Sequence, residues 1–363
     1  MHRRSLIAAP LLLLASRALG QGEDGASTTP GAAHAPPSPA VAPSPGAPAS
    51  PPPDRAATLT PILDRADALT PLRTVLVSRH GVPLAQRGYR GGRVDRPANI
   101  KSASKSIVSA LVGIAIDKGV LEGTGQTIAP LLRADLPANP DPRLHAITIG
   151  HLLSMQAGLE RTSGPYYGRW IASPNWVRAA LARPFADAPG GAMLYSTGST
   201  HLLSALLTRA SGRSTLALAR DWLGAVEGFS IASWERDPQG VYFGGNQMAM
   251  RPTSLLAFAE LYRRGGRNAA GAQIIPEAWI AESWRVRTAS RFTGDGYGYG
   301  WFTREMAGSH VHYGWGYGGQ MLYVAPMQGV SMVMTSTADA PSGRTGHRDD
   351  LHALAADLLA ALG

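Results

Sequence analysis

The order of secondary-structure patterns along residues 56–363 is the feature that most limits how this chain can fold. Strand-like segments stand at both ends of this region, and segments with helical spacing of apolar residues stand between them. Near the start, 74–77 and 83–85 surround His80-Gly81, which predicts a β-hairpin. Further strand-like segments, broken by Gly and Pro turns, lie at 297–303, 310–313, 320–325 and 329–335. We therefore expect one antiparallel sheet that joins the two ends of the region.

The helical segments complete this expectation. Ser102 to Lys118 carries its apolar residues on one face and Gly119 follows, which predicts a long buried helix. A shorter helix is expected to begin with Thr60 as N-cap and Pro61 as its first residue. Other segments with this spacing are 151–155, 176–182, 200–210, 216–226, 253–264, 276–285 and 347–362. The expected class is α+β, an α/β sandwich in which helices flank the sheet, with a mostly helical insertion at about 120–290.

The first 55 residues differ in character from the rest. Residues 1–20 combine the basic pair Arg3-Arg4, a short apolar run and a small residue at Gly20, which indicates a cleaved signal peptide. The apolar run is too short to span a bilayer, and both the twin-arginine and the general export routes fit it. Residues 21–55 contain ten prolines among Ala, Ser and Gly, which is typical of a disordered linker. We expect an exported protein, periplasmic or secreted.

Composition excludes several classes of function. The chain has no cysteine, so disulfides, thiolate metal sites and cysteine nucleophiles are excluded. The net charge of +9 would suit nucleic acid, but the arginines are scattered and three lie within residues 1–20. No nucleic-acid partner is therefore expected. The only lysines are Lys101, Lys105 and Lys118, and a lysine, unlike an arginine, can lose its proton when it is buried.

Ser102-Ala103-Ser104-Lys105 is the first pattern that could carry chemistry. Positions i and i+3 share a helix face, so the Ser102 hydroxyl and the Lys105 amine can meet at the start of the apolar helix. Burial would lower the lysine pKa, and a neutral amine could accept the serine proton. The alternative is that Ser102 is a helix N-cap and Lys105 a solvated charge. A cation in a first turn opposes the helix dipole, which counts against that alternative.

Two further segments are candidates. Tyr195-Ser196-Thr197 follows the turn at 189–191 and precedes a helix, where the Tyr195 phenol could relay a proton or simply bond to a backbone carbonyl. The segment 312–320 is rich in glycine, which allows close approach to a ligand or merely forms a turn. Its Gly314, Gly316 and Gly319 match a dinucleotide-binding pattern, but a strand follows rather than a helix, so that interpretation fails.

Aromatic and histidine residues give weaker signals. Tyr166, Tyr167, Trp170 and Trp176 either line a substrate pocket or pack in the core. His310 and His312 alternate on a strand without a matched set of further metal ligands, so we expect no metal.

Taken together and in this order, these motifs resemble the serine β-lactamase-related hydrolases, with the class C β-lactamase and DD-peptidase fold. The resemblance extends over nearly all of the chain after residue 60 and includes 147–159, and it is greatest to the 6-aminohexanoate-dimer hydrolases and related esterases. It implies Ser102 as nucleophile, Lys105 as general base and Tyr195 as proton shuttle. It also implies an oxyanion site between the Ser102 N–H and one from the Gly316 region, a small ester or amide substrate, and no cofactor.

Two departures from the family pattern bear on the substrate. Thr197 stands where lactamases have Asn, and the Lys-Thr-Gly motif corresponds to Tyr313-Gly314-Trp315 or, one residue earlier, to His312-Tyr313-Gly314. Neither register has the lysine that pairs with a substrate carboxylate, so we expect neutral esters to be preferred over cephalosporins. His312, Arg344 and Arg348 are the nearest alternative cations in the sequence. A β-lactamase or DD-peptidase proper, and a non-catalytic binding module of this fold, stay open.

Overall fold

The computed structural model describes residues 53–363, so the expected signal peptide at 1–20 and nearly all of the expected linker at 21–55 lie outside the described residues. The helices are α1 (Pro53–Arg65), α2 (Ser104–Asp117), α3 (Ile149–Leu153), α4 (Tyr167–Ile171), α5 (Trp176–Leu181), α6 (Thr197–Ser211), α7 (Thr215–Trp222), α8 (Pro252–Arg263), α9 (Glu277–Trp284), α10 (Ser342–Thr345) and α11 (His347–Leu362). The strands are β1 (Leu72–Arg79), β2 (Val82–Gly88), β3 (Ala98–Asn99), β4 (Ser233–Trp234), β5 (Met248–Met250), β6 (Thr288–Ala289), β7 (Gly296–Tyr297), β8 (Phe302–Met306), β9 (Ser309–Gly316), β10 (Gln320–Ala325) and β11 (Val330–Ser336). The fold is α+β, as the sequence predicts.

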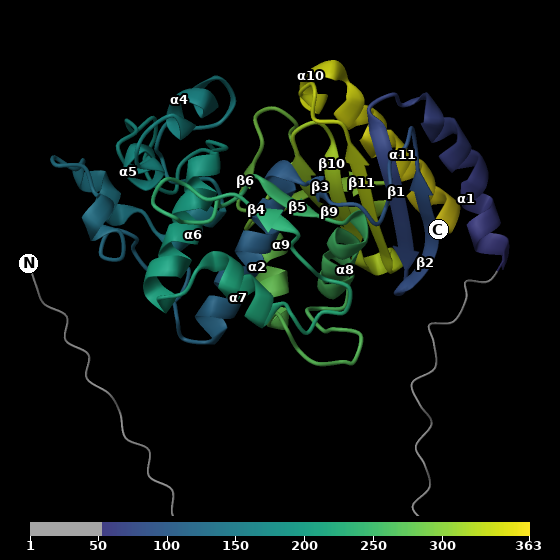
Figure 1. The fold of residues 1–363 in the computed structure, drawn as a ribbon, viewed down its shortest axis with the longest axis horizontal. Coiled ribbons are helices and arrows are strands. Elements are labelled where there is room, and N and C mark those ends of the chain that lie inside the picture. The colour runs from purple at the N-terminus through teal and green to yellow at the C-terminus, as the bar shows by residue number, and fades with distance from the viewer. Residues whose placement is uncertain (1–52) are drawn as a thin grey trace, which may run out of the picture. The chain divides into compact units, whose positions relative to one another are not determined.

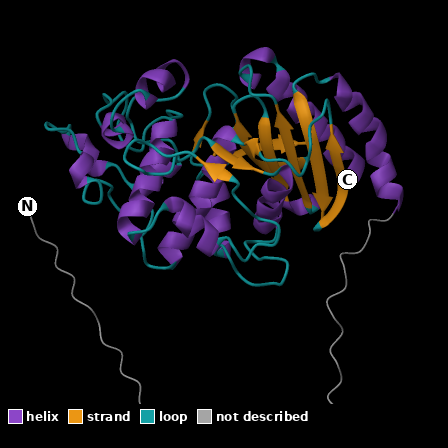
Figure 2. Cartoon of the chain, in the orientation of Figure 1, coloured by secondary structure: helices purple, strands orange, loops and turns teal. Residues whose placement is uncertain are grey.

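The expected antiparallel sheet is confirmed, and it joins the two ends of the region. Its eight strands have the order β2-β1-β11-β10-β9-β8-β7-β6, and every neighbouring pair is antiparallel. The hairpin strand β1 pairs with β11, so that Val75 lies opposite Met334. Figure 2 shows this sheet with helices around it and a largely helical region to one side.

The sheet is buried on both faces because its central strands carry apolar residues at successive positions. On β1, Val75 and Val77 belong to one core and Leu76 to the other. The first core lies against α1 and α11, which pack on each other, and the second lies against α8. In Figure 1, α1 and α11 lie together at one end of the molecule and α8 lies below the sheet. Alternation with period two places neighbouring side chains in different cores.

The first helix differs from the expectation. It begins at Pro53 and contains Pro61 in its interior, so the prediction that it starts after Thr60 is wrong. Leu59 is fully buried and Leu63 nearly so, and these two residues, one turn apart, place one face of the helix against the sheet. Burying a leucine contributes about 1.5–3 kcal/mol, which is comparable to the roughly 3 kcal/mol cost of an interior proline.

Between β3 and β6 the chain forms α2 to α9 and a small second sheet of order β3-β5-β4. The predicted helices at 102–118, 200–210, 253–264 and 276–285 correspond to α2, α6, α8 and α9 within a few residues at each end. The small sheet and α4 were not expected. The strands of the small sheet are two or three residues long, and α4 has five residues. Segments this short contain too few residues for a periodic pattern to be visible in the sequence.

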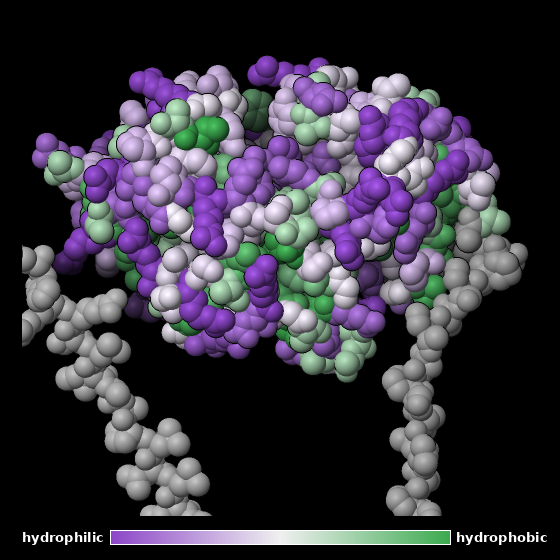
Figure 3. Space-filling model, in the orientation of Figure 1, coloured by the Kyte–Doolittle hydropathy of each residue, from purple (hydrophilic) through white to green (hydrophobic). Residues whose placement is uncertain are grey.

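The surface and the helix lengths bear on the expected partners. On the face shown in Figure 3, hydrophilic residues are spread across the surface with apolar residues between them. Among the described residues, no helix combines the length and the apolar character needed to cross a membrane.

Candidate active site

Ser102 lies in a short 3₁₀ turn, Lys101–Ala103, that leads directly into α2. Its hydroxyl caps no helix, because the N-cap position of α2 is Ala103 and no side chain caps that end. The interpretation of Ser102 as an N-cap is therefore wrong. The start of the helix is held against the connection between β7 and β8 by Ser106 Oγ, which donates to Gly300 O at 2.7 Å, and Ser109 Oγ, which donates to Tyr299 O at 2.7 Å. The nucleophile candidate thus stands on a rigid support.

Lys105 is buried in the first turn of α2, with its side chain pointing back to the serine. Its Nζ lies 2.9 Å from Ser102 Oγ, 2.8 Å from Gly245 O and 3.5 Å from Thr197 Oγ1. Burial lowers the pKa of Lys105 to about 7, because the charged form loses its contact with water, and no carboxylate among the described residues offsets this effect. A large fraction of the lysine is therefore a neutral amine at pH 7, which contradicts the alternative of a solvated charge.

Tyr195 lies beside both the lysine and the serine. The Lys105 Nζ is 5.1 Å from the centre of the Tyr195 ring, and that ring stacks on Phe302 with a centroid separation of 6.1 Å. Burial raises the pKa of Tyr195 to about 12, and a hydrogen bond with Ser102 acts in the opposite direction. The phenol therefore keeps its proton at neutral pH and is in contact with the serine hydroxyl. The structure brings all three residues of the expected catalytic set together.

Thr197, at the position where the resemblance in the sequence leads one to expect Asn, takes part in the same network. Its N–H donates to Ser163 Oγ at 2.8 Å, and its Oγ1 lies 3.0 Å from the same oxygen. Ser163 therefore orients the threonine hydroxyl toward the lysine amine.

The glycine-rich strand β9 passes close to the turn that carries Ser102. A Cβ on Gly316 would lie 2.3 Å from Ile100 O, and one on Gly314 would lie 3.1 Å from Ser106 Oγ. The backbone of β9 can approach the start of α2 only because these positions lack side chains. Tyr313, which directly precedes Gly314 on β9, points away from the start of α2, since its hydroxyl donates to Asp295 Oδ2 at 2.6 Å inside the α11 core.

His312 is also part of the interior. Its ring stacks on Trp284 at 4.1 Å, and its Nδ1 lies 2.9 Å from Thr303 Oγ1. Burial, with a smaller contribution from His310, lowers the pKa of His312 to about 3, so it is neutral. Among the residues of the two registers considered for the Lys-Thr-Gly position, Trp315 is the one that lines the cavity beside Ser102.

This cavity has a volume of about 590 Å³, within the range of small-molecule sites. Ser102, Tyr195 and Thr197 lie in its wall together with Tyr167 and Trp315. Two cations, Lys101 and Arg161, also line it. The residues that line the cavity include no Asp or Glu among those the structure describes.

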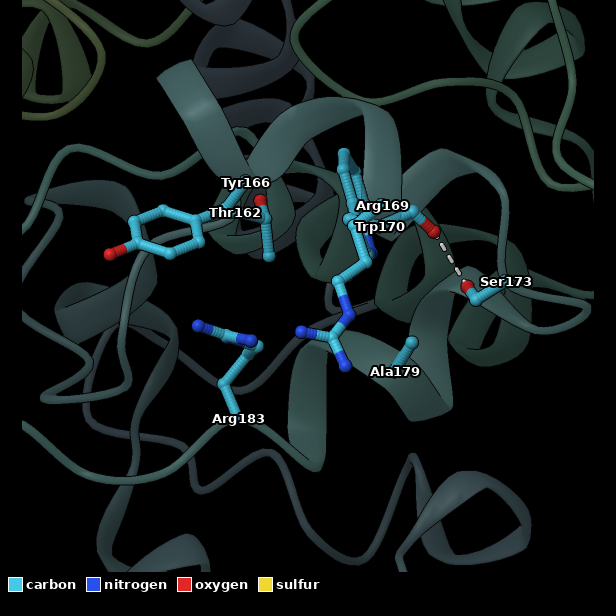
Figure 4. A pocket seen from close by; sticks show the side chains of 7 residues that line it. All are labelled: Thr162, Tyr166, Arg169, Trp170, Ser173, Ala179 and Arg183. Carbon is cyan, nitrogen blue, oxygen red and sulfur yellow. Dashed lines mark hydrogen bonds between the residues drawn. The ribbon is translucent and has the colours of Figure 1, made fainter.

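Tyr166 and Trp170 do not line this cavity. They border a separate, smaller cavity of about 170 Å³, between Arg169 and Arg183 (Figure 4). Trp170 is buried and packs on Trp176 and on other aromatic rings, as a core residue does. Of the aromatic residues from this part of the sequence, Tyr167 is the one at the cavity beside Ser102, where it accepts a hydrogen bond from Asn246 Nδ2 at 2.8 Å.

Sequence reasoning missed the segment 244–247. Its Gly245 has a φ of +79°, and a Cβ there would lie 2.8 Å from Lys105 Cγ. Gly244 N donates to His201 Nδ1 at 3.3 Å, and His201 Nε2 lies 3.0 Å from Asp237 Oδ2. This buried pair fixes the turn that presents the Gly245 carbonyl to the lysine. Gly244 and Gly245 are adjacent and predict a turn, but no local sequence pattern indicates that this turn lies close to Ser102 and Lys105.

Within residues 53–363, no group of three or more His, Asp or Glu side chains is arranged to hold a metal ion.

Solved structures with this fold are numerous. EstCE1, a hydrolase with promiscuous acyltransferase activity, has 18% sequence identity and a TM-score of 0.68 over 85% of this chain and 98% of its own. A penicillin-binding protein homologue from Caulobacter crescentus has 18% identity and a TM-score of 0.66 over 85% and 97%. A candidate 6-aminohexanoate-dimer hydrolase from Bacillus anthracis has 16% identity and a TM-score of 0.67 over 81% of each chain. At these identities the likeness concerns the fold.

A match to a protein family extends over most of the described region. Residues 67–357 match the family described as Beta-lactamase, a span that includes the serine, the lysine and the tyrosine of the site. The match agrees with the α+β fold, with the order of the motifs and with the contact between Ser102 and Lys105. The chain belongs to the Beta-lactamase family, whose members are mostly hydrolases.

Proposed function

We propose that this protein is an exported serine hydrolase that cleaves ester or amide bonds through an acyl-enzyme on Ser102. The observation that carries the proposal is the 2.9 Å contact between Ser102 Oγ and the buried amine of Lys105. A lysine with its pKa near 7 is a base of the right strength for proton transfer at neutral pH. The carboxyl-free surroundings of the amine support this role.

The contacts of Lys105 fit a neutral base. A neutral amine has two N–H bonds and one lone pair. The Gly245 carbonyl at 2.8 Å accepts one N–H bond, and Thr197 Oγ1 at 3.5 Å lies in the direction of the other. The lone pair is then directed to the Ser102 hydroxyl, which is the geometry a general base needs.

The reaction then proceeds in two halves. As Ser102 Oγ attacks the substrate carbonyl carbon, its proton passes to Lys105 Nζ. Tyr195 donates its phenolic proton to the leaving alcohol or amine as that bond breaks, and recovers a proton from Lys105. In the second half a water molecule attacks the acyl carbon and gives a proton to Lys105. Lys105 passes this proton to Ser102 Oγ as the bond between Oγ and the acyl carbon breaks, which releases the acid and restores both residues.

The developing oxyanion requires N–H donors near the reacting carbon. The Ser102 N–H and an N–H of β9 near Gly316 are the candidates for this role. The close approach of Gly316 to Ile100, two residues before the nucleophile, supports this assignment.

Intact-mass analysis tests the acyl-enzyme directly. The folded protein is exposed separately to a fluorophosphonate, a 4-nitrophenyl ester and a penicillin, with a Ser102→Ala variant as control. We expect a covalent adduct with the first two reagents that the alanine variant lacks. Folded wild-type protein that forms no adduct with any of the three would instead favour a non-catalytic binding module. A stable or hydrolysed penicillin adduct would favour a β-lactamase or DD-peptidase proper.

Export is a separate part of the proposal and rests on residues 1–20 alone. Expression of the full chain in a bacterium that has both export routes, followed by N-terminal sequencing of the periplasmic fraction, tests it. A mature end at Gln21 is expected. Recovery of the uncut chain from the cytoplasm alone would contradict it.

A further inference from the structure

The charge of the catalytic cavity differs from what the sequence leads one to expect. The segment that corresponds to the Lys-Thr-Gly motif lacks the lysine, which predicts a site without a fixed cation. In the structure, however, Lys101 and Arg161 both line the cavity. His312, Arg344 and Arg348, the alternatives named from the sequence, are absent from its wall. His312 is buried and neutral, and Arg348 is paired with Asp349 at 2.7 Å. The expected preference for neutral substrates thus loses its physical basis.

Lys101 is held at the cavity by an unusual backbone conformation. Its φ is +50°, a left-handed value that lysine rarely adopts, and its N–H donates to Asn99 Oδ1 at 3.0 Å. The side chain is half-buried, and its Nζ donates to Gln247 Oε1 at 3.0 Å. Gln247 in turn donates to Glu235, an exposed residue that does not line the cavity. The side-chain amide of Gln247 therefore lies between the Lys101 ammonium group and the Glu235 carboxylate, which do not contact each other in this network.

The Arg161 side chain contacts an aromatic ring rather than a carboxylate. Its guanidinium carbon lies 5.4 Å from the centre of the Phe292 ring, and Phe292 also lines the cavity. Among the described residues, no carboxylate lies within ion-pair distance of Arg161 or of Lys101. Partly buried cations generally find an anionic partner, and both of these face the same substrate space.

The rim of the cavity is apolar. Phe292 is 70% exposed and Tyr317 is 46% exposed, and both line the opening. Exposed aromatic side chains at a concave site favour binding of an apolar or aromatic part of a ligand.

We propose that Lys101 and Arg161 form a carboxylate-binding subsite, so that the substrate is an ester or amide that carries a carboxylate beside an apolar group. The inference rests on the proposed function, since it assigns a substrate class to the same cavity. The two cations replace in charge, but not in position, the lysine missing from β9. A carboxylate bound in this cavity can make charge-assisted hydrogen bonds with these side chains, since both line the cavity and neither has an ion-pair partner among the described residues.

Two pairs of substrates test the subsite, one for each side of the scissile bond. On the acyl side, 4-nitrophenyl hydrogen adipate is compared with 4-nitrophenyl hexanoate. On the leaving-group side, 4-acetoxybenzoate is compared with 4-acetoxybenzamide. After subtraction of spontaneous hydrolysis, we expect kcat/KM to be about tenfold or more higher for the anionic member of at least one pair. The ratio should fall as the salt concentration rises.

Variants assign the preference to the two cations. Lys101→Gln and Arg161→Gln should each lower the anionic-to-neutral ratio about three- to tenfold, and Lys101→Arg should retain most of it. Lys118→Gln and Arg169→Gln are matched controls, since each removes the same charge from an exposed residue outside this cavity. If the control variants lower the ratio as much as the cavity variants do, the effect is long-range steering and the subsite is refuted.

A binding measurement separates this inference from the proposed function. Ser102→Ala is titrated calorimetrically with both members of each pair. Charge-dependent binding to this variant, without turnover by the wild type, would refute the hydrolase and support the subsite. Turnover by the wild type with a ratio near one in both pairs, and no charge dependence of binding, would support the hydrolase and overturn the subsite.

Discussion

The carbonyl oxygen of Gly245 accepts a hydrogen bond of 2.8 Å from Lys105 Nζ, between residues 140 positions apart in the sequence. The turn that carries this carbonyl is fixed from behind by the buried His201–Asp237 pair through Gly244. The lysine amine is thus oriented by a backbone group, which cannot supply a charge that would keep it protonated. This arrangement explains how a buried lysine can be both held in place and neutral.

Gly245→Ala tests this arrangement. An alanine Cβ would lie 2.8 Å from Lys105 Cγ and 2.9 Å from Thr200 Cβ, at a φ of +79°. We expect the acylation rate to fall about ten- to hundredfold, because the lysine must move away from Ser102. Gly271→Ala is the control, since its φ is +86° and no atom lies within 4 Å of its added Cβ. Both variants lose stability from the left-handed backbone, about 1–2 kcal/mol, but only Gly245→Ala should lose activity. Equal activity in the two would refute the positioning role.

The pH dependence of acylation should follow Lys105. Burial lowers the pKa of this lysine to about 7, and the active form is the neutral amine. The rate should therefore rise about tenfold per pH unit below this pKa and level off above it. Tyr195, with its pKa raised to about 12, stays protonated and causes no decline below pH 10. Stopped-flow measurement of nitrophenolate release between pH 5 and 10 gives the profile. A rate that is constant from pH 5.5 to 9 would exclude Lys105 as the base.

Lys105→Arg should lose nearly all acylation activity. The substitution keeps a positive charge but removes the ability to accept a proton, since a guanidinium stays protonated in proteins. The expected loss is about 10² to 10⁴-fold. Thermal unfolding and circular dichroism confirm that the variant is folded, and Lys105→Met, with no charge at all, provides a second variant with the same expected loss. If the arginine variant kept more than about a tenth of the wild-type rate, Lys105 would not act as the base.

Tyr195→Phe examines the proton transfer to the leaving group. We expect kcat to fall by a similar factor while KM for a slow substrate changes little, because the ring still packs on Phe302. Tyr297→Phe is a suitable control, since this buried tyrosine lies in the same aromatic cluster, 6.4 Å from the Tyr195 ring, but outside the cavity wall. An unchanged kcat in Tyr195→Phe would leave this residue with a structural role only.

Local sequence patterns determined much of the fold and the centre of the site. The hairpin, the long helix α2, the strands β9 to β11 and α11 each follow from the spacing of apolar residues and from Gly and Pro at their ends. The expected single strand at 297–303 is wrong, because the structure divides this segment into β7 and β8 with a turn between them. Ser102 and Lys105 were predictable because their distance, one helical turn, depends on local geometry alone. Where local and tertiary preferences compete, as at Pro61 inside α1, burial of Leu59 in the sheet core decided the outcome.

The surroundings of Lys105 and the charge of the cavity depended on tertiary structure only. The sequence contains no signal that places Gly245 beside Lys105, Arg161 beside Phe292, or His312 in the interior rather than in the substrate space. Such contacts join segments whose separation along the chain exceeds any helix or strand period, so no periodicity encodes them. The pKa of the lysine and the electrostatic preference of the cavity are set by these contacts, because both depend on which groups exclude water and which charges are near.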